Sequence, residues 1–114
     1  MRYDLEERTA RFGERIIDFV KTLKEGSVNS PLIKQIVRSS TSIGANYCEA
    51  NNSSSKKDFR NKIFICKKEA SETKHWLRMI AKANQAKKDE CKLLWKEANE
   101  LTMIFSKIVS SLRP

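Results

Sequence analysis

The chain has 114 residues, of which 39% are hydrophobic and 32% are charged, and this composition predicts one globular domain over residues 1–114 rather than a disordered segment. Its three glycines and two prolines are too few for the many tight turns of a β-sandwich or barrel. The formal net charge of +9 favours polyanionic partners.

The first predicted helix begins near Asp4 and ends at Gly26. Apolar residues and one threonine recur along it at alternating spacings of four and three, which is typical of a helix that packs along its whole length. This seam comprises Leu5, Thr9, Phe12, Ile16, Phe19 and Leu23.

The second predicted helix begins at Ser30 and Pro31. Serine is a favourable N-cap, and proline suits the first turn because its missing N–H needs no partner there. We expect this helix to end in the polar run 51–54. Its seam comprises Leu32, Ile36, Ser39, Ile43, Asn46 and Ala50.

The third predicted helix opens at Ser55, and Asp58 three residues later resembles a capping box. The fourth begins near residues 87–89 and runs to the C-terminus. The third seam comprises Phe59, Ile63, Cys66, Ala70, Thr73, Leu77 and Ile80. The fourth comprises Leu94, Ala98, Leu101, Phe105, Ile108 and Leu112.

The four segments have similar lengths and short connections. This pattern predicts an all-α fold, an antiparallel up-down-up-down four-helix bundle. We expect the most central seam positions to be almost inaccessible to solvent. They are Phe12, Ile43, Ile63, Leu77, Leu101 and Phe105.

The second helix also carries a polar stripe at spacings of four, four and three, made of Arg38, Ser42, Asn46 and Glu49. Such a stripe indicates either a structural hydrogen-bonded network or a ligand site. We favour the network, because buried polar groups usually bond to one another and an unpaired one is costly. Glu69 and Glu72 of the third helix complete the network, and Arg38 is expected to pair with Glu49, Glu69 or Glu72.

A second stripe on the third helix is partly apolar. Ile65, Trp76 and Met79 lie on it, away from the main seam. These residues either widen the core of the chain or contact another copy of it. We favour self-association, because tryptophan and methionine are enriched at protein interfaces.

Positive charge is concentrated in the second half of the chain. Residues 1–52 carry eight Lys/Arg and seven Asp/Glu, whereas residues 53–114 carry fifteen and seven. A stripe along the third helix suits contacts with nucleic-acid phosphates, although a solvated helix surface is the simpler reading. The stripe comprises Lys56, Arg60, Lys67, Lys74, Arg78 and Lys82.

The sequence shows no motif for chemistry. It has no glycine-rich phosphate loop, nucleophile elbow or HExxH motif, so we expect no enzyme, no cofactor, no metal and no small-molecule substrate. It has no base-stacking aromatic motif either, so recognition by charge and shape is expected. Cys48, Cys66 and Cys91 form no CxxC pair, which fits free thiols in a reducing cytoplasm. We expect no membrane contact, because no apolar run is long enough to span a bilayer.

Two motifs at a fixed separation resemble those of the 23S rRNA intervening-sequence protein family. The first resembles the pattern R-S-x-x-S-I-x-x-N-x-x-E-A and consists of Arg38-Ser39, Ser42-Ile43, Asn46 and Glu49-Ala50. The second consists of residues 55–59, Lys68-Glu69-Ala70, Glu72 and Trp76-Leu77. Tyr47, Cys48 and Cys66 depart from the residues usual in the family at those positions, which affects local packing rather than the fold.

The resemblance implies a bacterial, cytoplasmic protein that forms a ring-like homopentamer. The family's first members were read from insertions within 23S rRNA genes. A related bundle, the accessory variability determinant of diversity-generating retroelements, binds nucleic acid through a basic surface. Together with the charge, this predicts a basic oligomer associated with RNA. The alternative is a homo-oligomeric scaffold for protein–protein contacts that binds no nucleic acid.

Overall fold

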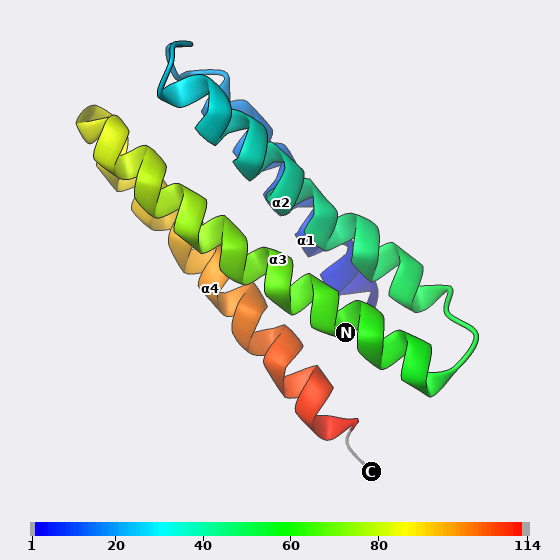
Figure 1. Cartoon of the computed structure of the whole chain (residues 1–114). Helices are drawn as coiled ribbons and strands as arrows, with labels where there is room; N and C mark the ends of the chain where they lie inside the picture. The colour runs from blue at the N-terminus through cyan, green and yellow to red at the C-terminus, as the bar shows by residue number, and fades with distance from the viewer. Residues whose placement is uncertain (1, 113–114) are drawn as a thin grey trace.

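The structure, a computed structural model, describes residues 2–112, with only the backbone of Arg2 and Tyr3. The helices are α1 (Arg2–Val20), α2 (Asn29–Asn51), α3 (Lys56–Ala83) and α4 (Lys88–Ser111), with a short 3₁₀ helix, η1 (Gln85–Lys87), before α4. Consecutive helices lie side by side and run in opposite directions in a rod of 46 × 21 × 19 Å (Figure 1). Residues 2–112 include no strand, and the all-α prediction is confirmed.

The start of α3 follows the prediction from sequence. Ser55 is the N-cap, and its Oγ accepts a hydrogen bond from the Asp58 backbone N–H at 3.0 Å. The start of α4 at Lys88 also lies within the predicted range. The α4 helix ends at Ser111, and its predicted continuation over residues 113–114 lies outside the described residues.

The predicted end of the first helix is wrong, because α1 ends at Val20 and not at Gly26. Beyond Val20 the chain tightens, and the amide of Leu23 bonds to the Val20 carbonyl at 3.1 Å. Leu23 nevertheless stays buried against the core. The apolar periodicity therefore continues to Leu23 after the helix has ended at Val20. For this reason the sequence pattern predicts the end of the helix too late.

The predicted N-cap of the second helix is also wrong. The α2 helix begins at Asn29, so Ser30 and Pro31 both lie in its first turn. The hydroxyl of Ser30 accepts a hydrogen bond from the Gly26 amide at 3.1 Å, and its own amide donates to the Gly26 carbonyl at 2.9 Å. Ser30 thus stabilises the loop before the helix instead of capping the helix.

The core agrees closely with the predicted seams. All six residues expected to be inaccessible are 0–1% exposed. In α2 the seam is shifted locally, because Tyr47 is buried where Asn46 was expected and Asn46 is only half-buried. The Tyr47 ring lies 6.2 Å from that of Phe105 on α4, so an aromatic pair joins these two helices across the core.

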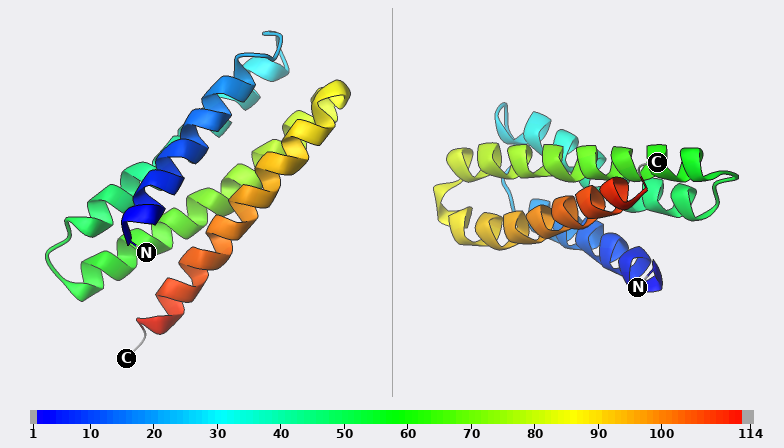
Figure 2. Two further views of the ribbon diagram at one scale, coloured as in Figure 1. Left: turned by 180° about the vertical axis from the view of Figure 1, so that it is seen from behind. Right: turned by 90° about the horizontal axis from the view of Figure 1, so that it is seen from below.

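The four edges of the bundle are not equally closed. The α1–α2, α2–α3 and α3–α4 pairs pack along their lengths, whereas α1 and α4 diverge and approach each other least (Figure 2). Arg8 of α1 bridges this open edge and donates two hydrogen bonds to Glu97 of α4, at 2.7 and 2.8 Å, and one to Glu100 at 3.0 Å. These bonds, first of all those to Glu97, raise the pKa of Arg8.

Candidate nucleic-acid interface

The charge asymmetry of the sequence corresponds to two sides of the bundle. The loop at residues 52–55 separates the α1–α2 hairpin, which is nearly neutral, from the α3–α4 hairpin, which carries the positive excess. The hairpins form opposite sides of the rod (Figure 1). The excess of positive charge therefore lies on one side of the rod (Figure 1).

The six cations predicted to bind phosphate differ in exposure. Lys56, Arg78 and Lys82 are exposed, whereas Arg60, Lys67 and Lys74 are half-buried. Within residues 2–112 none of the six forms an ion pair with a carboxylate. Their charge is consequently not neutralised inside the chain.

Two aromatic side chains lie beside this stripe, and the sequence analysis missed both. Phe64 on α3 is 51% exposed and Trp95 on α4 is 40% exposed. The Lys67 Nζ lies 5.8 Å from the centroid of the Phe64 ring, and the Lys74 Nζ lies 5.3 Å from that of Trp95. Phe64 and Lys67 lie three residues apart on α3, whereas the pair of Trp95 and Lys74 joins α4 to α3 and cannot be recognised from one helix alone.

A groove between α3 and the start of α4 extends the surface. It has a volume of about 460 Å³, and Trp95 lies in it beside Leu77, Ala81 and Cys91. Its remaining lining residues are all cationic, and no acidic residue lines it. They are Arg78, Lys88, Lys92 and Lys96.

The predicted pairing of Arg38 is confirmed with two of its three candidate partners. Its guanidinium contacts Glu69 at 3.2 Å and also contacts Glu72, so α2 and α3 are bridged. The Glu72 carboxylate in turn accepts a hydrogen bond from Trp76 Nε1 at 3.3 Å. Because the Arg38 side chain is 45% exposed, this network lies at the surface and not in the core.

The other members of the predicted polar network lie apart from Arg38's carboxylates. Ser42 Oγ donates to the Arg38 carbonyl at 2.6 Å, and Asn46 Nδ2 donates to the Ser42 carbonyl at 2.9 Å, both within α2. The third candidate partner of Arg38, Glu49, pairs instead with Lys62 at 2.8 Å. The stripe is therefore divided between bonds within α2 and separate bridges to α3.

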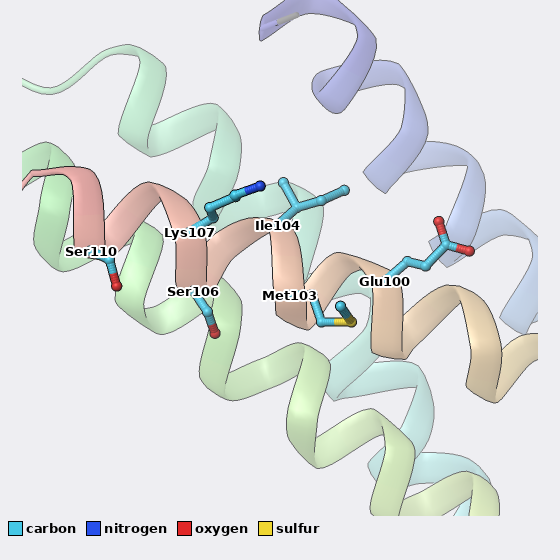
Figure 3. Close-up of a pocket in the computed structure, with 6 residues that line it drawn as sticks. All are labelled: Glu100, Met103, Ile104, Ser106, Lys107 and Ser110. Carbon is cyan, nitrogen blue, oxygen red and sulfur yellow. The ribbon is translucent and has the colours of Figure 1, made fainter.

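The predicted interface residues are only partly exposed. Ile65, Trp76 and Met79 are all half-buried, and Trp76 packs against the core. Larger apolar surfaces are exposed on α4, at Leu93 and Met103. Met103 lies in a shallow hollow whose six lining residues all belong to α4 (Figure 3). Apolar side chains are thus accessible in two separate patches, an α3 patch of Ile65, Trp76 and Met79 and an α4 patch of Leu93 and Met103.

The thiols are unpaired and weakly acidic. Burial raises the pKa of Cys66 to about 12 and that of Cys91 to about 11. The pKa of Cys48 is raised first by loss of solvent around the thiol and second by the negative charge of the nearby Glu6 carboxylate. Such thiols stay protonated near neutral pH and are poor nucleophiles.

Over the described part of the chain, no cluster of three or more His, Cys, Asp or Glu residues is placed to hold a metal ion. No described helix combines the length and apolar character needed to cross a membrane.

Comparison with known proteins agrees on one family. The sequence model of the 23S rRNA-intervening sequence protein family matches residues 2–107. A crystal structure of a protein of unknown function from the S23 ribosomal protein family of Bacteroides thetaiotaomicron superposes with a TM-score of 0.86 at 31% sequence identity. That match covers 96% of this chain and 99% of the other. No curated protein matches the chain.

Proposed function

The chain belongs to the 23S rRNA-intervening sequence protein family, and from this membership we propose that it is a non-enzymatic, basic homo-oligomer that binds RNA through α3 and the start of α4. The observation that carries the proposal is the segregation of charge. Residues 53–114 have fifteen Lys/Arg against seven Asp/Glu, and the six stripe cations form no ion pair among the described residues. Three unpaired cysteines support a cytoplasmic location, because free thiols persist in reducing compartments.

Binding of this kind is driven by phosphate contacts. Lysine and arginine side chains that neutralise phosphates release condensed counterions, so affinity falls as salt rises. Exposed cations on a rigid helix fix the position of the nucleic acid but do not read its bases. We therefore expect low sequence specificity and a strong dependence on ionic strength.

The self-association that we propose uses the two apolar patches. A closed ring needs heterologous contacts, in which one surface of each copy meets a different surface of the next. The half-buried Met79 on α3 and the exposed Met103 on α4 lie in two such surfaces. A ring would also repeat the basic stripe in every subunit, so that weak phosphate contacts add up.

Light scattering is expected to give a pentamer, with five times the 13.2 kDa mass of the chain. Met79→Glu and Met103→Glu each place a charge in one side of the contact, and either should dissociate the ring. Val28→Glu, at an exposed apolar residue before α2, is the control and should leave the mass unchanged. A wild-type mass of 13.2 kDa at micromolar concentration would rule out self-association.

The RNA proposal is tested by reversing charge where it does not disturb packing. Arg78 and Lys82 are exposed, so Arg78→Glu/Lys82→Glu should keep the fold. Lys67 and Lys74 are less suitable, because they are half-buried and lie against Phe64 and Trp95. Each lost phosphate contact should reduce the slope of log affinity against log salt by about 0.7–0.9, so the double variant should lose about 1.4–1.8. Fluorescence anisotropy with a labelled RNA stem-loop, measured at several salt concentrations, gives this slope.

The matched control places the same change of net charge on the other hairpin. Lys21 and Lys34 are exposed and belong to the α1–α2 side, so Lys21→Glu/Lys34→Glu should leave the slope nearly unchanged. If the two double variants behave alike, general net charge and not the proposed surface controls binding. If the wild type fails to bind RNA even at low salt, the scaffold function is favoured, which the exposed Leu93 and Met103 on α4 independently support.

A further inference from the structure

We propose that the groove between α3 and the start of α4 binds an unpaired RNA nucleotide, with its base against Trp95 and its phosphate held by the cationic rim. This inference rests on the proposed RNA binding and names the class of RNA that the surface selects. The groove joins an exposed indole to Arg78, Lys88, Lys92 and Lys96, and no carboxylate lines it.

The lining of the groove suits a nucleotide better than a purely apolar partner. Leu77, Ala81, Cys91 and Trp95 offer an apolar surface for a planar base, and an aromatic face stacks on every base. An apolar helix docked here would remove water from the surrounding lysines without compensating their charge. A nucleotide instead supplies an anion for the rim and a flat apolar body for the floor, so charge and shape are both complementary.

The base must be unpaired to reach Trp95. In an A-form duplex the bases are stacked inside, and the major groove is too deep and narrow for side chains to read. Trp95 lies in the groove beside Leu77 of α3. Phe64 precedes Leu77 by thirteen residues on the same helix, so Phe64 lies about 20 Å from the groove along α3, at a rise of about 1.5 Å per residue. Each aromatic side chain lies close to a lysine of the stripe: Trp95 to Lys74, and Phe64 to Lys67. The surface thus offers two stacking positions with cations between them, an arrangement typical of single-stranded nucleic-acid binding.

The test compares a short unstructured single-stranded RNA with a duplex of the same length. Trp95→Leu removes the stacking face but keeps an apolar side chain, and it should weaken single-strand binding by about 5-fold or more. It should leave duplex binding unchanged, because the duplex presents phosphates alone. Arg78→Glu/Lys82→Glu should weaken both. Val28→Ala, at an exposed apolar residue of the other hairpin, is the control and should change neither affinity.

A spectroscopic measurement separates stacking from an indirect effect on folding. In the Trp76→Phe background Trp95 is the sole tryptophan, since the chain has two. Its fluorescence should be quenched by the single-stranded RNA and not by the duplex. Circular dichroism should show the same helix content for Trp95→Leu as for the wild type.

The outcomes distinguish this inference from the proposed function. If wild-type protein binds neither RNA, the proposed function fails and the groove has no nucleotide to hold. If wild-type protein binds both RNAs and Trp95→Leu weakens neither, RNA binding stands and the groove proposal is overturned. If Trp95→Leu changes the mass in light scattering and leaves RNA affinity intact, the groove is a contact between copies of the chain, which also overturns the proposal.

Discussion

Replacing Leu101 with alanine is expected to lower the free energy of unfolding by about 2–5 kcal/mol. Leu101 is 0% exposed and belongs to the central core cluster of the bundle. Truncation removes buried methyl groups and leaves a cavity that the surrounding helices fill only in part. Urea unfolding followed by circular dichroism should show a lower midpoint with an unchanged slope, since the surface exposed on unfolding hardly changes.

Leu93→Ala is the matched control for this variant. Leu93 lies on the same helix but is 61% exposed, so the same truncation should change stability by less than about 0.5 kcal/mol. A near-neutral Leu101→Ala would contradict the placement of the α4 seam at the centre of the core. A large effect of Leu93→Ala, accompanied by a change in mass, would place Leu93 in a contact between copies.

The cores of the four helices could be read from periodicity because each seam follows the helical repeat. A single cause explains why some buried residues lie outside the predicted seams. Tyr47, Cys91 and Val109 are buried beside the predicted seams, because a helix in a four-helix bundle touches two neighbours and buries a wider stripe than one seam. A narrow seam is the pattern of a two-stranded coiled coil, and it underestimates the buried face here.

The helix ends were less predictable because they depend on local bonds that residue type does not determine. Ser55 caps α3 as expected, yet Ser30, also a serine before a helical pattern, bonds to Gly26 in the preceding loop. The choice depends on how the chain enters the helix. A serine N-cap needs an extended backbone, which Ser55 has at φ −148° and ψ 161°, whereas Ser30 already lies within the first turn of α2.

The candidate site was only half visible in the sequence. The cations of α3 share a helix, so their spacing was enough to group them. Trp95 and Lys74 are 21 positions apart on different helices, and the α3–α4 packing brings the ammonium to 5.3 Å from the indole ring. Grouping them requires the register between two antiparallel helices. This register is set by contacts across the core, which no single helix contains.

Gly44→Leu is expected to destabilise the protein by about 1–3 kcal/mol, because it overpacks the contact between α1 and α2. A Cβ atom at Gly44 would lie 3.3 Å from Thr9 Oγ1 and 3.5 Å from the Thr9 backbone carbon. The further atoms of a leucine side chain have no room unless α1 moves away. The higher helix propensity of leucine offsets this only in part, by less than about 1 kcal/mol.

Gly13→Ala, on α1, is expected to stabilise the protein, in contrast to Gly44→Leu. A Cβ there would meet Thr41 Cγ2 at 3.6 Å and the Ser40 carbonyl oxygen at 3.7 Å, which are ordinary contacts. Alanine at this helical position should therefore stabilise the protein by about 0.5–1 kcal/mol.

Urea unfolding measures both variants, and hydrogen exchange should localise the Gly44→Leu effect to α1, whose edge with α4 is already the least closed. If Gly44→Leu were as stable as the wild type, α1 would have room to shift. Gly44 would then not be required for the close approach of α2 to α1.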